Sequence, residues 1–125
     1  MPRILIIDDE KAVADTCALV LSGAGHTVAI APDGLAGLHV LRTEPADLIL
    51  TDLQMPYGGL PAIQQLRRLY PKVPIIVMSG AGKTQLDGAD TIGAHYTLSK
   101  PFTTDELNAA VAQMLQGQPK SPPSA

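Results

Sequence analysis

Charged and hydroxyl side chains follow four short apolar runs of this 125-residue sequence. They are Asp8 and Asp9 after the first run, Asp52 at the end of the third, Ser79 at the end of the fourth and Lys100 after the fifth. Short, branched apolar runs bounded by turn residues are typical of strands buried on both faces. Desolvating a charge inside such a strand is expensive, so we expect these groups at strand ends, where they can meet a ligand.

These residue types point to phosphoryl chemistry supported by a metal ion. Three clustered carboxylates repel one another, and Mg²⁺, which takes carboxylate, water and phosphate oxygens, would relieve that repulsion. The sequence has no Cys/His cluster that would suggest zinc. Lys100 can pair with a phosphoryl group and Ser79 can hydrogen-bond one of its oxygens. Asp52 is the residue best placed to act as a carboxylate nucleophile and form an aspartyl phosphate.

The pattern predicts a strand followed by a helix, repeated five times, and therefore a parallel sheet with helices on both faces. Such sheets bind ligands beyond the carboxyl ends of their strands. In the third helix we expect Ile63, Leu66 and Leu69 to face inward. The predicted strands are about Arg3–Ile7, His26–Ala31, Ala46–Leu53, Val73–Met78 and His95–Leu98, and the helices about Lys11–Leu21, Leu35–Thr43, Pro61–Leu69, Thr84–Ile92 and from the Thr103 N-cap to Gln116.

Length and composition indicate one domain over residues 1–116, followed by a Pro-rich stretch at 117–125 that is disordered or a linker. The net charge of −3 and scattered basic residues argue against direct nucleic-acid binding. The single cysteine, Cys17, excludes an internal disulfide and fits a reducing compartment. No apolar run approaches membrane-spanning length and no signal-peptide layout is present. We therefore expect a cytoplasmic protein with no membrane contact.

Taken together, the motifs resemble the receiver domain of two-component response regulators over about residues 3 to 116. Each motif is weak alone, but their order and spacing are specific to that family. The matching pieces are Ile4-Leu-Ile-Ile-Asp8-Asp9-Glu10, Pro32-Asp33-Gly34, Asp47-Leu-Ile-Leu-Thr-Asp52-Leu-Gln-Met-Pro56, Pro74-Ile-Ile-Val-Met-Ser79-Gly80, Gly93-Ala94 and Lys100-Pro101-Phe102.

The resemblance implies a flavodoxin-like, doubly wound five-stranded sheet with strand order 2-1-3-4-5. It implies that Asp52 accepts a phosphoryl group from a histidine kinase or a histidine phosphotransfer protein. Asp9, Asp52 and the Gln54 carbonyl would bind Mg²⁺ directly, with Asp8 acting mainly through water. Members of this family catalyse only their own phosphorylation and dephosphorylation, so no other enzymatic activity is expected.

In the same family Lys100 would pair with the phosphoryl group and Ser79 would make the switch contact. Three departures from the family pattern affect the expected switch. Thr97 stands where the family usually has an aromatic residue, and the adjacent Tyr96 is expected to be a packed core or edge tyrosine. The loop at Tyr57–Leu60 is about one residue short. The stretch Gly80–Ile92 is rich in small residues, so we expect it to be mobile or partly irregular.

The favoured function is a phosphoacceptor signalling domain that acts through protein–protein contacts, either alone or attached to an output domain. The main alternative is a receiver-like binding module with weak or no phosphorylation-driven switching, which Thr97 favours. A Mg²⁺-dependent phosphatase that uses Asp52 covalently is less favoured. No second acid lies two residues after Asp52, and the sequence has no cap insertion to hold a substrate.

Overall fold

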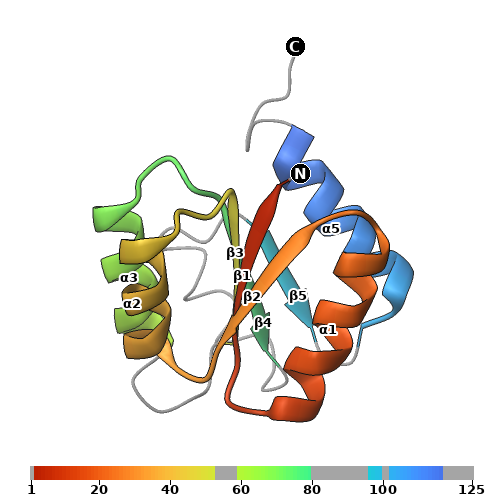
Figure 1. Ribbon diagram of the computed structural model, residues 1–125, viewed down its shortest axis with the longest axis horizontal. Coiled ribbons are helices and arrows are strands. Elements are labelled where there is room, and N and C mark those ends of the chain that lie inside the picture. Colours follow the sequence, from red (N-terminus) through yellow and green to blue (C-terminus); the bar gives the residue numbers. More distant parts are fainter. Residues whose placement is uncertain (1, 53–58, 80–95, 100–101, 117–125) are drawn as a thin grey trace.

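The computed structural model describes residues 2–52, 59–79, 96–99 and 102–116. These residues form a five-stranded parallel sheet in the order β2-β1-β3-β4-β5, with helices on both faces (Figure 1). This confirms the predicted flavodoxin-like fold class and strand order. The predicted helix at Thr84–Ile92, the loop at Tyr57 and the stretch 117–125 lie outside the described residues. The elements are β1 (Arg3–Ile7), α1 (Lys11–Gly23), β2 (Thr27–Ala31), α2 (Gly34–Thr43), β3 (Leu48–Asp52), α3 (Gly59–Leu69), β4 (Ile75–Ser79), β5 (Tyr96–Ser99) and α5 (Thr104–Gln116).

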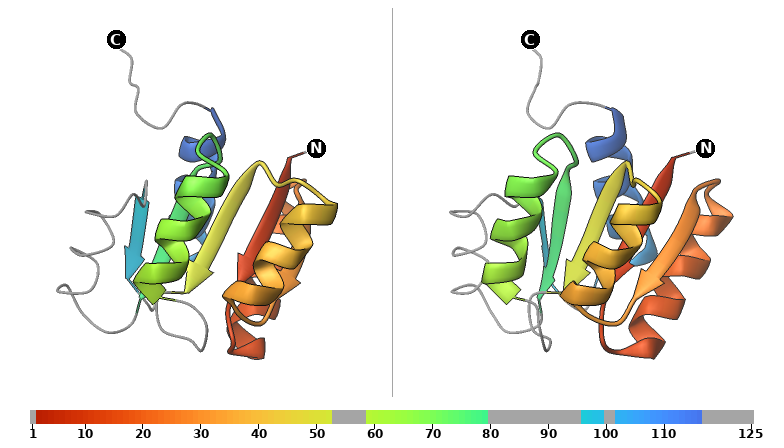
Figure 2. Two further views of the ribbon diagram at one scale, coloured as in Figure 1. Left: turned by 90° about the vertical axis from the view of Figure 1, so that its left-hand side faces the viewer. Right: turned by 60° about the vertical axis from the view of Figure 1, so that its left-hand side comes forward.

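Two apolar layers hold the helices against the sheet. Helices α1 and α5 cover one face, while α2 and α3 cover the other and lie in front of the sheet in Figure 2. Alternate residues of each strand enter opposite layers because side chains alternate along a strand. Ile4 and Ile6, for example, pack toward α1 and α5, whereas Leu5 and Ile7 pack toward α2 and α3. None of the described helices is both long and apolar enough to cross a membrane.

The inward face of α3 differs from the prediction at one residue. Ile63 and Leu66 are buried, but Leu69 is 53% exposed. In a helix, the residue six positions after Ile63 points well away from the buried face that contains Ile63 and Leu66. The residue seven positions after Ile63 points toward that face again. Tyr70 occupies that seventh position and packs against the same core layer. The expectation for Leu69 was therefore wrong, and Tyr70 takes its place.

Side chains cap the start of two helices. The Asp33 Oδ1 accepts the Ala36 N–H at 2.8 Å at the start of α2. At the start of α5, the Thr103 hydroxyl oxygen accepts the Glu106 N–H at 3.0 Å, and the Glu106 carboxylate accepts the Thr103 N–H at 2.8 Å. The second arrangement is a capping box, and it confirms the N-cap expected at Thr103.

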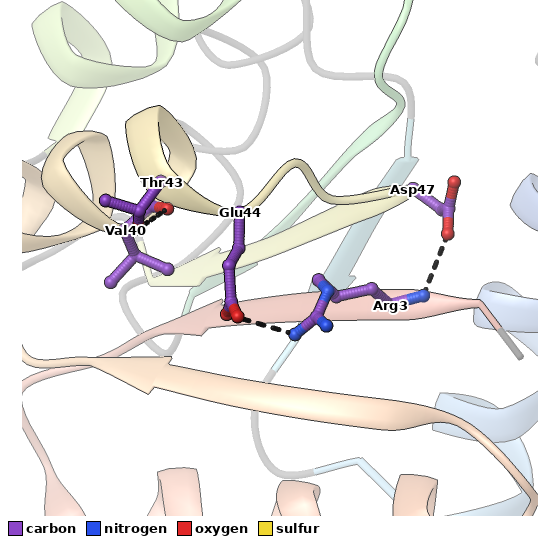
Figure 3. A network of polar contacts seen from close by, with 5 residues as sticks. All are labelled: Arg3, Val40, Thr43, Glu44 and Asp47. Atoms are coloured by element: carbon purple, nitrogen blue, oxygen red, sulfur yellow. Dashed lines mark hydrogen bonds and ion pairs between the residues drawn. The ribbon is translucent and has the colours of Figure 1, made fainter.

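A polar network fastens β1 to the start of β3 (Figure 3). The Arg3 backbone N–H donates to the Asp47 carboxylate at 2.8 Å, and the Asp47 N–H donates to the Arg3 carbonyl at 2.7 Å. The Arg3 guanidinium also pairs with the Glu44 carboxylate at 3.2 Å, where both side chains are partly exposed. The reciprocal Arg3–Asp47 pair closes the amino-terminal end of the β1–β3 ladder, the end opposite the predicted site.

We predict that Asp47→Ala lowers the free energy of unfolding by about 1 kcal/mol, because the Arg3 N–H loses its charged acceptor. Asp47→Asn should lose less, since an amide oxygen can still accept that hydrogen bond. Glu44→Gln breaks only the exposed ion pair and should change stability by less than about 0.5 kcal/mol. Urea unfolding of the three variants checks this order. Equal losses in all three would contradict the assignment.

Helix α2 approaches β1 closely at Gly37. A Cβ added at this buried glycine would lie 2.6 Å from Ile7 Cδ1 and 3.0 Å from Ile7 Cγ1. Ile7 is fully buried in the α2–α3 layer and immediately precedes Asp8. The missing side chain at residue 37 therefore lets the helix pack directly on the strand that leads into the predicted site.

We predict favourable coupling between Gly37→Ala and Ile7→Val, because valine lacks the Cδ1 atom that the new methyl group would strike. Ile7→Val alone should cost about 1 kcal/mol. The double variant should be more stable than the sum of the single changes by about 1 kcal/mol. Gly23→Ala is the matched control, since an added Cβ there meets nothing within 4 Å. The same coupling between Ile7→Val and Gly23→Ala would refute the steric explanation.

Candidate functional site

Three carboxylates gather at the carboxyl edge of the sheet. Asp8, Glu10 and Asp52 each offer one oxygen, and these oxygens all lie within 4.8 Å of one another. Asp8 directly follows β1, Asp52 ends β3, and Glu10 directly precedes α1. Two of the residues predicted from the sequence, Asp8 and Asp52, are therefore brought together, and a third acid joins them.

The register of β1 and β3 explains why Asp8 and Asp52 meet. Ile7 pairs with Thr51 in the parallel ladder, so the next residue of each strand reaches the same edge. Strands β1 and β3 are neighbours in the sheet. From β1 the chain continues to β2 on one side, and from β3 it continues to β4 on the other side. Open α/β sheets bind ligands at this reversal of strand order.

Burial distinguishes these two aspartates from ordinary surface acids. Among the described residues, the buried polar or charged ones are Asp8 at 2% exposure, Thr51 at 1% and Asp52 at 4%. Burying a carboxylate is costly unless hydrogen bonds or an opposite charge compensate it. The two buried carboxylates at this sheet edge therefore require compensating hydrogen bonds or positive charge.

The turn after β1 directs Glu10 toward the site. The Asp8 N–H donates to the Ala31 carbonyl of β2 at 3.1 Å. The Asp8 Oδ1 then accepts the Glu10 backbone N–H at 2.9 Å. This short-range bond folds the chain back after Asp8. Asp9, between the two, is exposed and is not a member of the three-carboxylate group.

The remaining predicted residues lie at the same edge or outside the described part of the chain. Ser79 is the last residue of β4, and the preceding residue, Met78, pairs with Asp52. Thr97 lies in β5, where its backbone pairs with Val77. Gln54 and Lys100 fall outside the described residues, so their roles stay predictions.

The tyrosine beside Thr97 is packed as the sequence indicated. Tyr96 is half-buried and contacts the α1–α5 core layer, on the side of the sheet that also buries Leu98. This confirms that Tyr96 is a packed core tyrosine.

The donor set fits a hard cation. All three groups offer carboxylate oxygen, which suits Mg²⁺ or Ca²⁺ rather than a soft metal. Octahedral Mg²⁺ at about 2.1 Å from each ligand would place neighbouring oxygens roughly 3 Å apart and opposite ones roughly 4 Å apart. The group therefore needs only small side-chain movements to close around such an ion.

Glu10 is the member of the acidic group that the sequence analysis did not single out. The run Asp8-Asp9-Glu10 was visible, but three consecutive acids do not reveal which of them face one point. The sequence feature that could have identified Glu10 is its position two residues after Asp8, because an aspartate side chain often accepts a hydrogen bond from the backbone N–H two residues further on. That turn brings residue 10, rather than residue 9, back toward the strand end.

Comparisons with known proteins agree with this geometry. The sequence model of the response regulator receiver domain matches residues 4–112. A DNA-binding dual master transcriptional regulator, RpaA of Synechocystis, is 36% identical over all of this chain and 54% of its own length. The alkaline phosphatase synthesis regulator SphR of Synechococcus elongatus is 39% identical over 98% of this chain and 53% of its own. The chain thus spans about half the length of these curated relatives.

Solved structures give the same result. The receiver domain of NtrX from Brucella abortus superposes with a TM-score of 0.87 at 27% identity, covering 92% of this chain and 99% of that one. A putative response regulator from Chloroflexus aurantiacus gives a TM-score of 0.88 at 29% identity, covering 93% and 98%.

The doubly wound α/β fold and the acidic group at its carboxyl edge are those of a signalling domain, and the acidic group fits a phosphorylation site. The chain belongs to the response regulator receiver domain family. Response regulators are signalling proteins of two-component systems, and this membership confirms the resemblance drawn from the sequence motifs.

We predict that Asp8→Asn is more stable than Asp8→Ala by about 1 kcal/mol in metal-free buffer, because the amide oxygen can still accept the Glu10 N–H. Both variants should lose most of the stabilisation that Mg²⁺ gives the unmodified protein, since both remove a charged ligand. That stabilisation should reach about 1.4 kcal/mol at a tenfold excess of Mg²⁺ over its Kd. Chemical unfolding with and without Mg²⁺ measures both effects. A full Mg²⁺ response in Asp8→Asn would contradict the assignment of Asp8 to the site.

Proposed function

We propose that this domain accepts a phosphoryl group on Asp52 in a Mg²⁺-dependent reaction and signals through the resulting change in protein contacts. The observation that carries the proposal is the gathering of the Asp8, Glu10 and Asp52 oxygens within 4.8 Å at the sheet edge. Membership of the receiver family makes phosphoryl transfer, rather than metal storage, the activity that this geometry supports best. The proposal concerns the region shared with the longer relatives.

In the proposed reaction a phosphoryl group moves from a histidine nitrogen of the donor to a carboxylate oxygen of Asp52. A carboxylate oxygen of Asp52 attacks phosphorus of a phosphohistidine, the new O–P bond forms as the P–N bond breaks, and the imidazole leaves and takes up a proton. Water reverses the modification by attacking the same phosphorus, which returns the Asp52 carboxylate and inorganic phosphate. The domain would catalyse only these two reactions on itself.

Bound Mg²⁺ would neutralise charge that develops on the phosphoryl oxygens. Asp9, Asp52 and the Gln54 carbonyl are proposed to hold it directly, with Asp8 acting mainly through water, as the family resemblance implies. Lys100 is proposed to pair with a phosphoryl oxygen, and Ser79, at the end of β4, to hydrogen-bond another.

The proposed donor is a histidine kinase or a histidine phosphotransfer protein. Signalling would follow a population shift, in which the phosphoryl group stabilises one of two packings of the β4–β5 side of the domain. Thr97 in the usual aromatic position favours a smaller rearrangement than is common in the family. With Thr97 in place, the domain would still signal, but through a different set of protein–protein contacts.

We expect incubation with acetyl phosphate and Mg²⁺ to add the mass of one phosphoryl group to the protein. Asp52→Asn should stay unmodified, because an amide is not a competent nucleophile here. Intact-mass spectrometry measures the change, and chelation of Mg²⁺ should abolish it. Asp105→Asn, which neutralises an exposed acid in the first turn of α5, serves as the charge-matched control.

The competing functions give different results in the same samples. A binding module without phosphorylation would gain no phosphoryl mass in either the wild-type chain or Asp52→Asn, which would refute the proposal. A phosphatase would release phosphate from many small phosphomonoesters with repeated turnover, and Asp52→Asn would abolish that release.

A further inference from the structure

Thr51 places a hydroxyl group in an apolar layer of the core. It is 1% exposed, and the hydrophobic residues 48–50 that precede it in β3 are fully buried. Its backbone pairs with Ile7 in β1 and Val77 in β4, and both of these residues belong to the α2–α3 layer. Because side chains alternate along a strand, Thr51 lies on the same face as Ile49, which also packs in that layer. A hydroxyl buried there is costly unless it is hydrogen-bonded.

The hydroxyl is bonded to the backbone of the next residue. Thr51 donates from Oγ1 to the carbonyl oxygen of Asp52 at 3.1 Å, and this bond is buried. Valine has nearly the same shape as threonine and favours strands equally well, so it would fill the position without bringing in a polar group. The hydroxyl therefore adds something that packing alone does not require, which is a fixed direction for the Asp52 carbonyl.

That carbonyl lies where the chain leaves the sheet. Asp52 is the last residue of β3; it still pairs with Met78 of β4, but the β1–β3 ladder ends one residue earlier, at the pair of Ile7 and Thr51. The carbonyl and the carboxylate of Asp52 are joined through the same Cα atom, so a backbone rotation there changes the direction of the carboxylate. The hydroxyl bond spans residues 51 and 52 and restricts that rotation.

We propose that Thr51 is a positioning residue for the phosphoacceptor, because its hydroxyl bond to the Asp52 carbonyl orients the Asp52 carboxylate for attack on phosphorus. The proposal rests on the phosphorylation of Asp52 proposed above. Thr51 acts through the backbone of Asp52 rather than on the reacting atoms. A displacement of about 1 Å at a reacting group can lower its rate about a hundredfold, so a bond that fixes the nucleophile affects the rate more than the stability.

Two substitutions separate the hydroxyl from the methyl group of Thr51. Thr51→Val keeps the branched shape and removes the hydroxyl, and we expect it to gain phosphoryl mass from acetyl phosphate and Mg²⁺ roughly tenfold more slowly. Thr51→Ser keeps the hydroxyl and should react within about twofold of the wild-type rate, although the cavity left by the methyl group lowers its unfolding midpoint below that of Thr51→Val. The order of the rates is thus opposite to the order of the stabilities. A purely structural role would make the less stable variant the slower one.

Thr43→Val is the matched control, because it removes a hydroxyl bond of the same kind at the opposite edge of the sheet. The Thr43 hydroxyl donates to the Val40 carbonyl at 3.0 Å at the end of α2 (Figure 3). Its loss should leave the phosphorylation rate unchanged. Intact-mass spectrometry follows the rate in each variant, urea unfolding gives the midpoints, and far-ultraviolet circular dichroism confirms that the fold is retained.

Each outcome decides the role of Thr51. An unchanged rate in Thr51→Val overturns it, and so does a slower reaction in Thr51→Ser than in Thr51→Val. Failure of the wider function has a different signature. If the wild-type chain gains no phosphoryl mass, both proposals fall; if it is phosphorylated on Asp52 and Thr51→Val reacts equally fast, only the role of Thr51 falls.

Discussion

The proximity of the Asp8 and Asp52 carboxylates is the constraint on which the site depends. Like charges repel most strongly where water is scarce, and both residues are nearly buried. They stay together because β1 and β3 are adjacent central strands whose register is fixed by apolar side chains on both faces. A slip of one residue would move every one of those side chains into the wrong layer. The cost of separating the carboxylates is therefore the cost of disrupting the core.

The two ends of the β1–β3 ladder have opposite chemistry. At the amino-terminal end, Arg3 and Asp47 exchange backbone and side-chain hydrogen bonds, so their polar groups are matched. At the carboxyl end, the carboxylates of Asp8, Glu10 and Asp52 gather instead. The Arg3–Asp47 hydrogen bonds and the apolar layers stabilise the sheet. That stability allows the carboxyl end to keep closely spaced acids that would otherwise be unfavourable. The acidic group is thus confined to one edge of a sheet that is stabilised elsewhere.

The sequence by itself determined the fold and placed Asp8 and Asp52 at the same edge of the sheet. Continuous apolar runs identified the central strands, and their spacing from helical stretches indicated a parallel sheet. Because strand ends at one edge of such a sheet meet, Asp8 and Asp52 could be placed together without coordinates. The N-cap at Thr103 was also readable from the sequence, since it depends on neighbours within one turn. These features are local or follow directly from topology.

Only the tertiary structure decided which of the acids after Asp8 lies beside it and Asp52, how α3 ends and how closely α2 approaches the sheet. Glu10 lies beside Asp8 because of a turn held by the Asp8 side chain, and Tyr70 replaces Leu69 because helical rotation returns it to the core. The glycine at residue 37 matters only because Ile7 lies against it. Each outcome depends on distances between segments far apart in the chain, or on the direction of a single turn. A linear pattern of residue types does not contain that information.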